Sequence, residues 1–268
     1  MLFLLAYVAL FLALWGILTA AVPLLQRVLT ATANRTARFR YRDYVPVGIL
    51  LVAGLGGTVF LADEFLDLAE LVHESSPRLR EIDSGAHEWA RTYRSPGATA
   101  FFTTWTVIGT PWFLAIIAAV VGVVLATRRR WRWLLYLAFT SGVGALIVVQ
   151  LKVYFARARP DLAVALRKAH GYSFPSGHAM GSTILFLALS YLAFRAVYRW
   201  KWKAASIALA WTSIAAISFS RVYLGVHWIS DIGAGIAGGT LWVVVTTVAY
   251  ETFRRIRAIR ALRRRRTE

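Results

Sequence analysis

The residues of this chain best suited to chemistry are two histidines and an aspartate at the ends of long apolar stretches. His227 and Asp231 are four residues apart, so in a helix they share one face, where the carboxylate can bind one imidazole nitrogen and fix its tautomer. The other nitrogen is then free to act as a nucleophile. His178, from another part of the chain, is a candidate general acid for the leaving oxygen.

Three cations and a glycine-containing helix start accompany these residues. Lys152 and Arg159 flank the end of one apolar stretch, and Arg221 ends another. Ser176 and Gly177 open a third stretch, where free backbone N–H groups and the helix dipole favour an anion. Three cations and a helix end would over-neutralise a single carboxylate, so phosphate fits better. The set predicts phosphoryl transfer through a phosphohistidine intermediate.

Metal binding and transport are the alternatives. Two histidines and an aspartate could hold zinc or iron. However, three cations would repel a divalent ion, and the spacing of Asp231 from His227 is that of a hydrogen-bonding partner. We therefore expect no metal and no cofactor. A transporter or channel would also use charges in the membrane, but it has no need of a His–Asp pair beside a phosphate site.

The composition indicates a membrane protein. The chain has 268 residues, 58% of them hydrophobic, and a formal net charge of +18. That charge alone suggests a nucleic-acid partner, but a mean hydropathy of +0.57 does not suit a soluble domain. With no cysteine, disulfides, thiolate nucleophiles and iron–sulfur clusters are excluded.

Seven apolar stretches are long enough, or nearly so, to cross a hydrocarbon core that needs about 20 helical residues. They are approximately residues 2–25, 44–62, 106–127, 133–155, 177–197, 204–222 and 228–253. We expect an all-α, polytopic membrane bundle of about seven transmembrane helices. It forms a single membrane domain over 1–268, with an additional N-terminal span and basic loop (1–43), a six-helix core (44–253) and a basic tail (254–268).

The charges predict the orientation. Most of the 31 Lys and Arg residues follow the first, third, fifth and seventh stretches, and the positive-inside rule makes that side cytoplasmic. The N-terminus is then outside, the C-terminus is cytoplasmic, and the candidate site is extracytoplasmic. Because the excess positive charge is explained by orientation in the membrane, we expect no nucleic-acid partner. The composition suggests a bacterial inner membrane.

The outer loop at residues 63–104 is rich in acids. Ser76-Pro77 and Ser95-Pro96 are typical of helix starts, so we expect short amphipathic helices on the membrane surface. We interpret this loop as a cap without chemistry, and His73, His87 and His170 as loop histidines outside the site.

Three motifs together resemble a known family. Lys152-x6-Arg159-Pro160, Pro175-Ser176-Gly177-His178 and Ser220-Arg221-x5-His227-x3-Asp231 resemble the signatures of the type 2 phosphatidic acid phosphatase superfamily. This superfamily includes integral-membrane lipid phosphate phosphatases and shares its core with vanadium haloperoxidases. The resemblance covers about residues 106–250, and the N-terminal span departs from the simplest six-helix pattern.

Carried over residue by residue, the resemblance implies His227 as nucleophile, Asp231 as its orienting carboxylate and His178 as the acid. It implies that the phosphate is bound by Lys152, Arg159, Ser176, Gly177 and Arg221, without a metal.

The expected activity is hydrolysis of a lipid phosphate or pyrophosphate, with undecaprenyl pyrophosphate or phosphatidylglycerophosphate as the first candidates. A lipid phosphotransferase with the same site is the alternative, and a lipid or ion transporter is a weaker one. The expected partners are the lipid substrate and membrane lipids.

Overall fold

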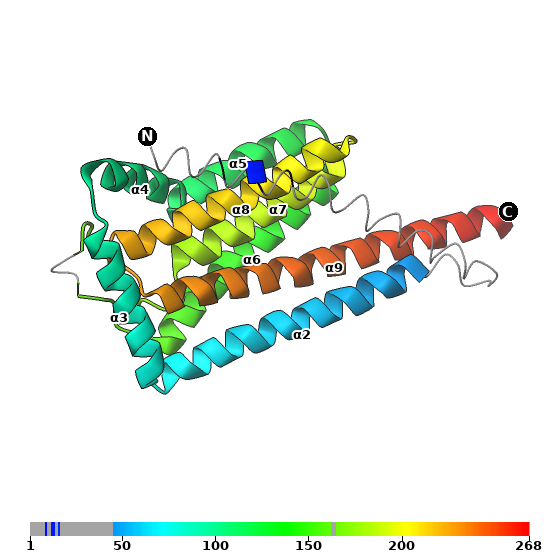
Figure 1. Ribbon diagram of the computed structural model, residues 1–268. Coiled ribbons are helices and arrows are strands. Elements are labelled where there is room, and N and C mark those ends of the chain that lie inside the picture. The colour runs from blue at the N-terminus through cyan, green and yellow to red at the C-terminus, as the bar shows by residue number, and fades with distance from the viewer. Residues whose placement is uncertain (1–8, 10–11, 14–15, 17–44, 162–164, 268) are drawn as a thin grey trace.

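The computed structural model of the chain describes residues 9, 12–13, 16, 45–161 and 165–267 (Figure 1). The first expected span, at residues 2–25, lies almost wholly outside this part. Every regular element within it is a helix. The helices are α2 (Val45–His73), α3 (Pro77–Thr92), α4 (Pro96–Ile108), α5 (Pro111–Thr127), α6 (Trp131–Phe155), α7 (Gly177–Ala196), α8 (Trp200–Tyr223) and α9 (Ile229–Thr267). The expected all-α membrane bundle is confirmed.

Helix starts follow the prolines. Both α3 and α4 begin at the proline of a Ser-Pro pair, as the sequence predicts. Proline suits the first helical position because its missing N–H would have no partner there. The Ser95 side chain also accepts a hydrogen bond from the Ala98 N–H at 3.3 Å, which caps α4.

The span expected at residues 106–127 is not one continuous helix. The chain breaks between α4 and α5, and the two helices are bent by 53°. Pro111 begins α5, and a residue before proline is disfavoured in the helical region, so Thr110 is extended at φ −69° and ψ 144°. The residues on both sides of the break are apolar, so a hydropathy pattern alone predicts one continuous span.

Two helices run further than expected. The second span was predicted to end near Ala62, but α2 continues through the acidic stretch to His73. The residues of the basic tail expected at 254–268 are helical as far as Thr267, as a continuation of α9. These two helices lie side by side along one flank of the bundle (Figure 1). Within the described residues, four helices are long and apolar enough to cross a membrane, or five if bent α4 and α5 form one span.

The central helix is α7, which packs against α5, α6, α8 and α9. Two glycines let α9 approach it closely. A Cβ at Gly235 would lie 3.0 Å from the Ala179 Cβ and 3.1 Å from the Ser176 carbonyl oxygen, and one at Gly239 would lie 2.9 Å from the Thr183 Cβ. This contact brings the first turns of α7 and α9 together, where both carry motif residues.

The ends of the bundle differ. At one end, α3 lies across the helix ends beside the segments that join α6 to α7 and α8 to α9 (Figure 1). The opposite end contains the α5–α6 and α7–α8 turns and the C-terminal half of α9, with their basic residues. The acidic segment and the basic turns thus lie at opposite ends of the bundle, as the alternation of basic and acidic loops along the sequence predicts.

Candidate active site

His227 is the centre of the predicted site. It lies between α8 and α9, and only 1% of its surface is exposed. Its Nδ1 is 3.2 Å from Asp231 Oδ2, and its Nε2 is 3.1 Å from Arg159 Nη1. Because the carboxylate can only accept, Nδ1 carries the proton and the lone pair of Nε2 points towards Arg159. This is the tautomer that leaves Nε2 available as a nucleophile.

The pKa of His227 favours the neutral form. Burial, together with the nearby cations of Arg159 and Arg221, lowers it to about 3 against the opposing effect of Asp231. Burial also lowers the pKa of Arg159, although that group remains a cation at neutral pH. His227 is therefore unprotonated at neutral pH, as a nucleophilic imidazole must be.

The three predicted cations surround this histidine from separate elements. Arg159 donates to the Val226 carbonyl at 2.7 Å, and its other donors bind backbone carbonyls of the α6–α7 segment. The Lys152 ammonium, at the end of α6, donates to the Tyr172 carbonyl at 2.7 Å. Arg221 is 5% exposed and donates to the Thr106 hydroxyl, but its Nε is buried with no hydrogen-bond partner. A buried donor without a partner calls for an explanation, and a bound anion beside Arg221 would supply one.

The N-terminus of α7 completes the cradle. Ser176 caps the helix by accepting from the Ala179 N–H, and its own N–H donates to the Asp231 carbonyl at 3.0 Å. Gly177 and His178 are the first two helical residues, whose N–H groups have no acceptor within the helix. A Cβ at Gly177 would lie 3.5 Å from Lys152 Cε, so this helix start and the lysine are neighbours.

His178 reaches the same region from α7. It is partly buried, and its imidazole forms no hydrogen bond to the residues that the structure describes. It packs against the α4–α5 break, because a Cβ at Gly109 would lie 3.1 Å from its Cδ2. An imidazole with both nitrogens uncommitted can donate to a leaving oxygen.

Asp231 has more partners than the sequence indicates. Ser173 donates to its Oδ2 at 2.5 Å, as does the Trp228 N–H at 3.0 Å, while Arg157 Nη1 donates to its Oδ1 at 2.7 Å. The second terminal nitrogen of Arg157 binds Asp83 on α3, also at 2.7 Å. All of these partners were missing from the predicted site.

The acidic loop, which the sequence predicts to be a cap without chemistry, contacts the candidate site. Asp83 binds the arginine that holds Asp231, and His87 Nε2 donates to the His227 carbonyl at 2.9 Å. One signal was readable: Leu79, Asp83 and Ala90 lie on the buried face of α3, where an acid is unexpected.

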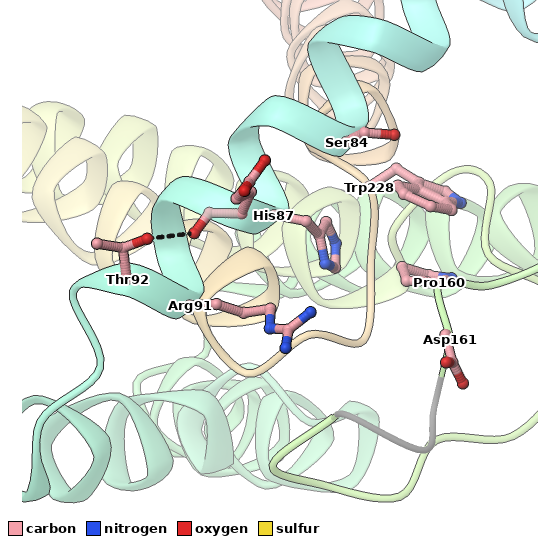
Figure 2. Close-up of a pocket in the computed structure, with 8 residues that line it drawn as sticks. Ser84, His87, Arg91, Thr92, Pro160, Asp161 and Trp228 are labelled. Atoms are coloured by element: carbon pink, nitrogen blue, oxygen red, sulfur yellow. Dashed lines mark hydrogen bonds between the residues drawn. The ribbon is translucent and has the colours of Figure 1, made fainter.

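Two cavities adjoin the site. One, of about 600 Å³, is lined by Ser84, His87, Glu88, Arg91, Thr92, Pro160, Asp161 and Trp228. Figure 2 shows His87 and Arg91 pointing from α3 towards Pro160 and Trp228 across it. The other, of about 400 Å³, has a mixed lining from α2, α3 and the end of α6 that also includes Arg157 and Arg159.

A metal site is not assembled from the candidate ligands. Within the described part of the chain, no three His, Asp or Glu side chains are grouped closely enough to hold a metal ion. The groups around His227 are one carboxylate and several cations, a donor set that suits an anion.

Comparison with known proteins agrees with the motifs. The sequence matches the PAP2 superfamily over residues 133–255. It is 28% identical to phosphatidylglycerophosphatase B of Bacillus subtilis, over 72% of this chain and 94% of that protein. It is 31% identical to decaprenylphosphoryl-5-phosphoribose phosphatase of Mycobacterium tuberculosis, over 50% of this chain and 70% of that one.

Solved structures match the helical arrangement. The crystal structure of the transmembrane PAP2-type phosphatidylglycerolphosphate phosphatase from Bacillus subtilis superposes with a TM-score of 0.67 at 28% identity, covering 72% of this chain and 96% of that one. Aquifex aeolicus LpxE, at 21% identity and a TM-score of 0.51 over 62% of this chain and 94% of that one, supports the fold alone. The chain therefore belongs to the PAP2 superfamily and is an integral-membrane phosphatase.

Proposed function

We propose that this enzyme hydrolyses a lipid phosphate through a phosphohistidine on His227, without a metal, at the extracytoplasmic face of the membrane. The observation that carries the proposal is the placement of His227 between Asp231 on Nδ1 and Arg159 on Nε2. This arrangement leaves a neutral imidazole lone pair directed at the place where three cations converge.

In the first step, Nε2 of His227 forms a bond to phosphorus as the bond from phosphorus to the lipid oxygen breaks. The phosphate oxygens bind Lys152, Arg159, Arg221 and the N–H groups at the start of α7. Protonated His178 gives its proton to the leaving oxygen, and Asp231 stabilises the charge that develops on His227.

In the second step, water attacks phosphorus and the P–N bond breaks. His178, now neutral, takes the proton from that water, which returns both histidines to their starting states. The cations that bound the substrate also bind the phosphate oxygens in this step, so the same cradle serves both displacements.

The 400 Å³ cavity supports a lipid substrate. Leu71, Leu79 and Phe155 are among its apolar lining residues, and Arg159 of the cradle also lines it. A lipid with its head group at Arg159 would place the adjoining part of its chain against these apolar side chains. Because the Bacillus subtilis relative, found both as a sequence and as a crystal structure, is a phosphatidylglycerophosphate phosphatase by name, we take phosphatidylglycerophosphate as the first substrate to test and undecaprenyl pyrophosphate as the second.

Phosphate release from purified protein tests the proposal. We expect release from at least one of these lipids with EDTA present, and a loss of about 10³-fold or more in kcat for His227→Ala. His170→Ala is the matched control, because its exposed side chain is removed while the backbone carbonyl that binds Arg159 is kept. Loss of activity in EDTA with recovery on adding zinc would contradict the metal-free mechanism.

A further inference from the structure

Arg157 connects two buried carboxylates from distant parts of the chain. Its Nη1 binds Asp231 Oδ1 and its Nη2 binds Asp83 Oδ2, each at 2.7 Å. Asp83 is 1% exposed and Asp231 is fully buried. Charges taken out of water are tolerated only when they are paired and hydrogen-bonded, so this arginine compensates both acids at once.

The geometry distinguishes Arg157 from the arginines of the cradle. Both of its terminal nitrogens are committed to carboxylates, and Nη1 also donates to the Ser230 hydroxyl at 2.7 Å. Arg159 instead binds backbone carbonyls, and Arg221 keeps a buried Nε without a partner. A phosphate oxygen would have to displace a carboxylate from Arg157, but not from the other two.

Arg157 and His227 bind different oxygens of Asp231. Arg157 holds Oδ1, whereas Oδ2 faces His227 Nδ1 at 3.2 Å. Fixing Oδ1 restricts rotation of the carboxylate, and so sets the direction from which Oδ2 meets the imidazole. The arginine thereby acts on the nucleophile through Asp231 without touching it.

Asp83 in turn fixes Arg157 and joins α3 to the start of α9. Its Oδ1 accepts from the Ser230 N–H at 3.0 Å and its Oδ2 accepts from the Ser230 hydroxyl at 2.8 Å. Ser230 directly precedes Asp231, so the surface helix is held against the turn that carries the catalytic carboxylate.

We infer that Arg157 is a positioning residue that orients Asp231 for catalysis, that Asp83 positions Arg157, and that α3 is therefore part of the catalytic assembly. This inference rests on the proposed function, since it assigns a role relative to the His227 nucleophile.

The pKa of His227 distinguishes a positioning role of Arg157 from a purely structural one, because it depends on the charges around the imidazole. His227 faces Asp231 of α9, Arg159 of the α6–α7 segment, Arg221 of α8, His178 of α7 and His87 of α3. Arg157 offsets part of the charge of Asp231. Removing Arg157 therefore strengthens the effect of the Asp231 carboxylate and raises the pKa of His227. Removing the charge of Asp83 has the opposite effect: the positive charge of Arg157 is then offset by Asp231 alone, and the pKa of His227 falls.

The experiment compares Arg157→Gln, Arg157→Lys, Asp83→Asn and the Asp83→Asn/Arg157→Gln double variant. Controls on α3 are Arg78→Gln and Glu81→Gln, whose side chains are exposed. We expect Arg157→Gln to lower kcat by about 10- to 100-fold with little change in KM, and Arg157→Lys to recover part of that loss. Asp83→Asn should add little to Arg157→Gln, because it acts through that residue.

The acidic limb of kcat/KM, which requires neutral His227, should move to higher pH in Arg157→Gln and to lower pH in Asp83→Asn. Histidine-selective ¹⁵N NMR without substrate should show the pKa of His227 raised in Arg157→Gln and lowered in Asp83→Asn. This measurement tests the inference even if the wild type is inactive on every lipid. Such inactivity would overturn only the proposed function. A raised KM with unchanged kcat in Arg157→Gln would mean that Arg157 binds the substrate phosphate. An unshifted titration of His227 in both Arg157→Gln and Asp83→Asn would mean that Arg157 and Asp83 contribute only to packing. Either result overturns the inference.

Discussion

At the residue scale, the two histidines of the site have unlike surroundings, and this predicts unlike roles. His227 is fixed from both sides by hydrogen bonds, whereas His178 has none to the residues described. A nucleophile needs a fixed direction of attack, and a residue that donates and then accepts a proton needs uncommitted nitrogens. The covalent intermediate can be trapped by removing only the second residue.

We expect His178→Ala to accumulate a phosphoenzyme with an aryl phosphate, whose good leaving group needs no acid. Formation then proceeds, but hydrolysis slows because no base deprotonates water. Rapid quench with labelled substrate should give an acid-labile, base-stable adduct, and His227→Ala should give none. If no adduct forms at any time in His178→Ala, a direct attack by water would replace the covalent mechanism.

Much of the residue-scale site could be predicted because each motif is short. His227 and Asp231 are separated by one helical turn, and Ser176, Gly177 and His178 are consecutive. The partners that were missed are long-range: Arg157 and Asp231 are 74 positions apart, as are Arg157 and Asp83. The packing of the α6–α7 segment against the start of α9 brings Arg157 to Asp231, and the placement of α3 across the bundle end brings Asp83 to Arg157. No local pattern encodes either placement.

At the element scale, the break between α4 and α5 positions His178. Gly109 ends α4 in a right-handed helical conformation at φ −83°, which alanine tolerates, so only space opposes a side chain there. A Cβ at this position would overlap Ile217 Cγ2 and lie 3.1 Å from His178 Cδ2. Ile217 is fully buried, which limits how far it can move.

We therefore expect Gly109→Ala to displace His178 and to lower kcat by about 10-fold or more, since small displacements of a catalytic group are costly. Steady-state kinetics on the lipid substrate measures this effect. Gly142→Ala is the matched control, because nothing lies within 4 Å of a Cβ built there. Unchanged kcat in Gly109→Ala together with a lower Tm would mean that the break serves packing alone.

Hydropathy predicted the cores of α6, α7 and α8 well because each is a continuous apolar run between charged turns. It missed the ends of α2 and α9, where the helix continues into charged sequence. Helical hydrogen bonding does not stop where apolar residues stop, so an end that lacks a proline or a capping residue is poorly defined by composition.

At the scale of the whole molecule, the separation of charged loops predicts the orientation in the membrane. Tyr198 lies in the α7–α8 turn, at the basic end of the bundle, and is 99% exposed. Glu81 lies on α3 at the opposite end and is also exposed. The chain contains no cysteine, so each position can carry a single unique label.

We expect Glu81→Cys to react with a membrane-impermeant maleimide in intact cells, and Tyr198→Cys to react only after permeabilisation. Gel-shift labelling with a polyethylene-glycol maleimide measures both. Labelling of Tyr198→Cys alone in intact cells would place the candidate site on the cytoplasmic side.

Helix α9 is continuous from the candidate site to the basic end of the bundle. At about 1.5 Å per residue, its 39 residues extend for about 58 Å, roughly twice the thickness of a hydrocarbon core. Asp231 is in its first turn, and Arg254, Arg255, Arg257 and Arg260 lie far along the same rod. These arginines therefore belong to the same continuous helix as Asp231, so a change in the tilt of α9 at the basic end would also move the turn that contains Asp231.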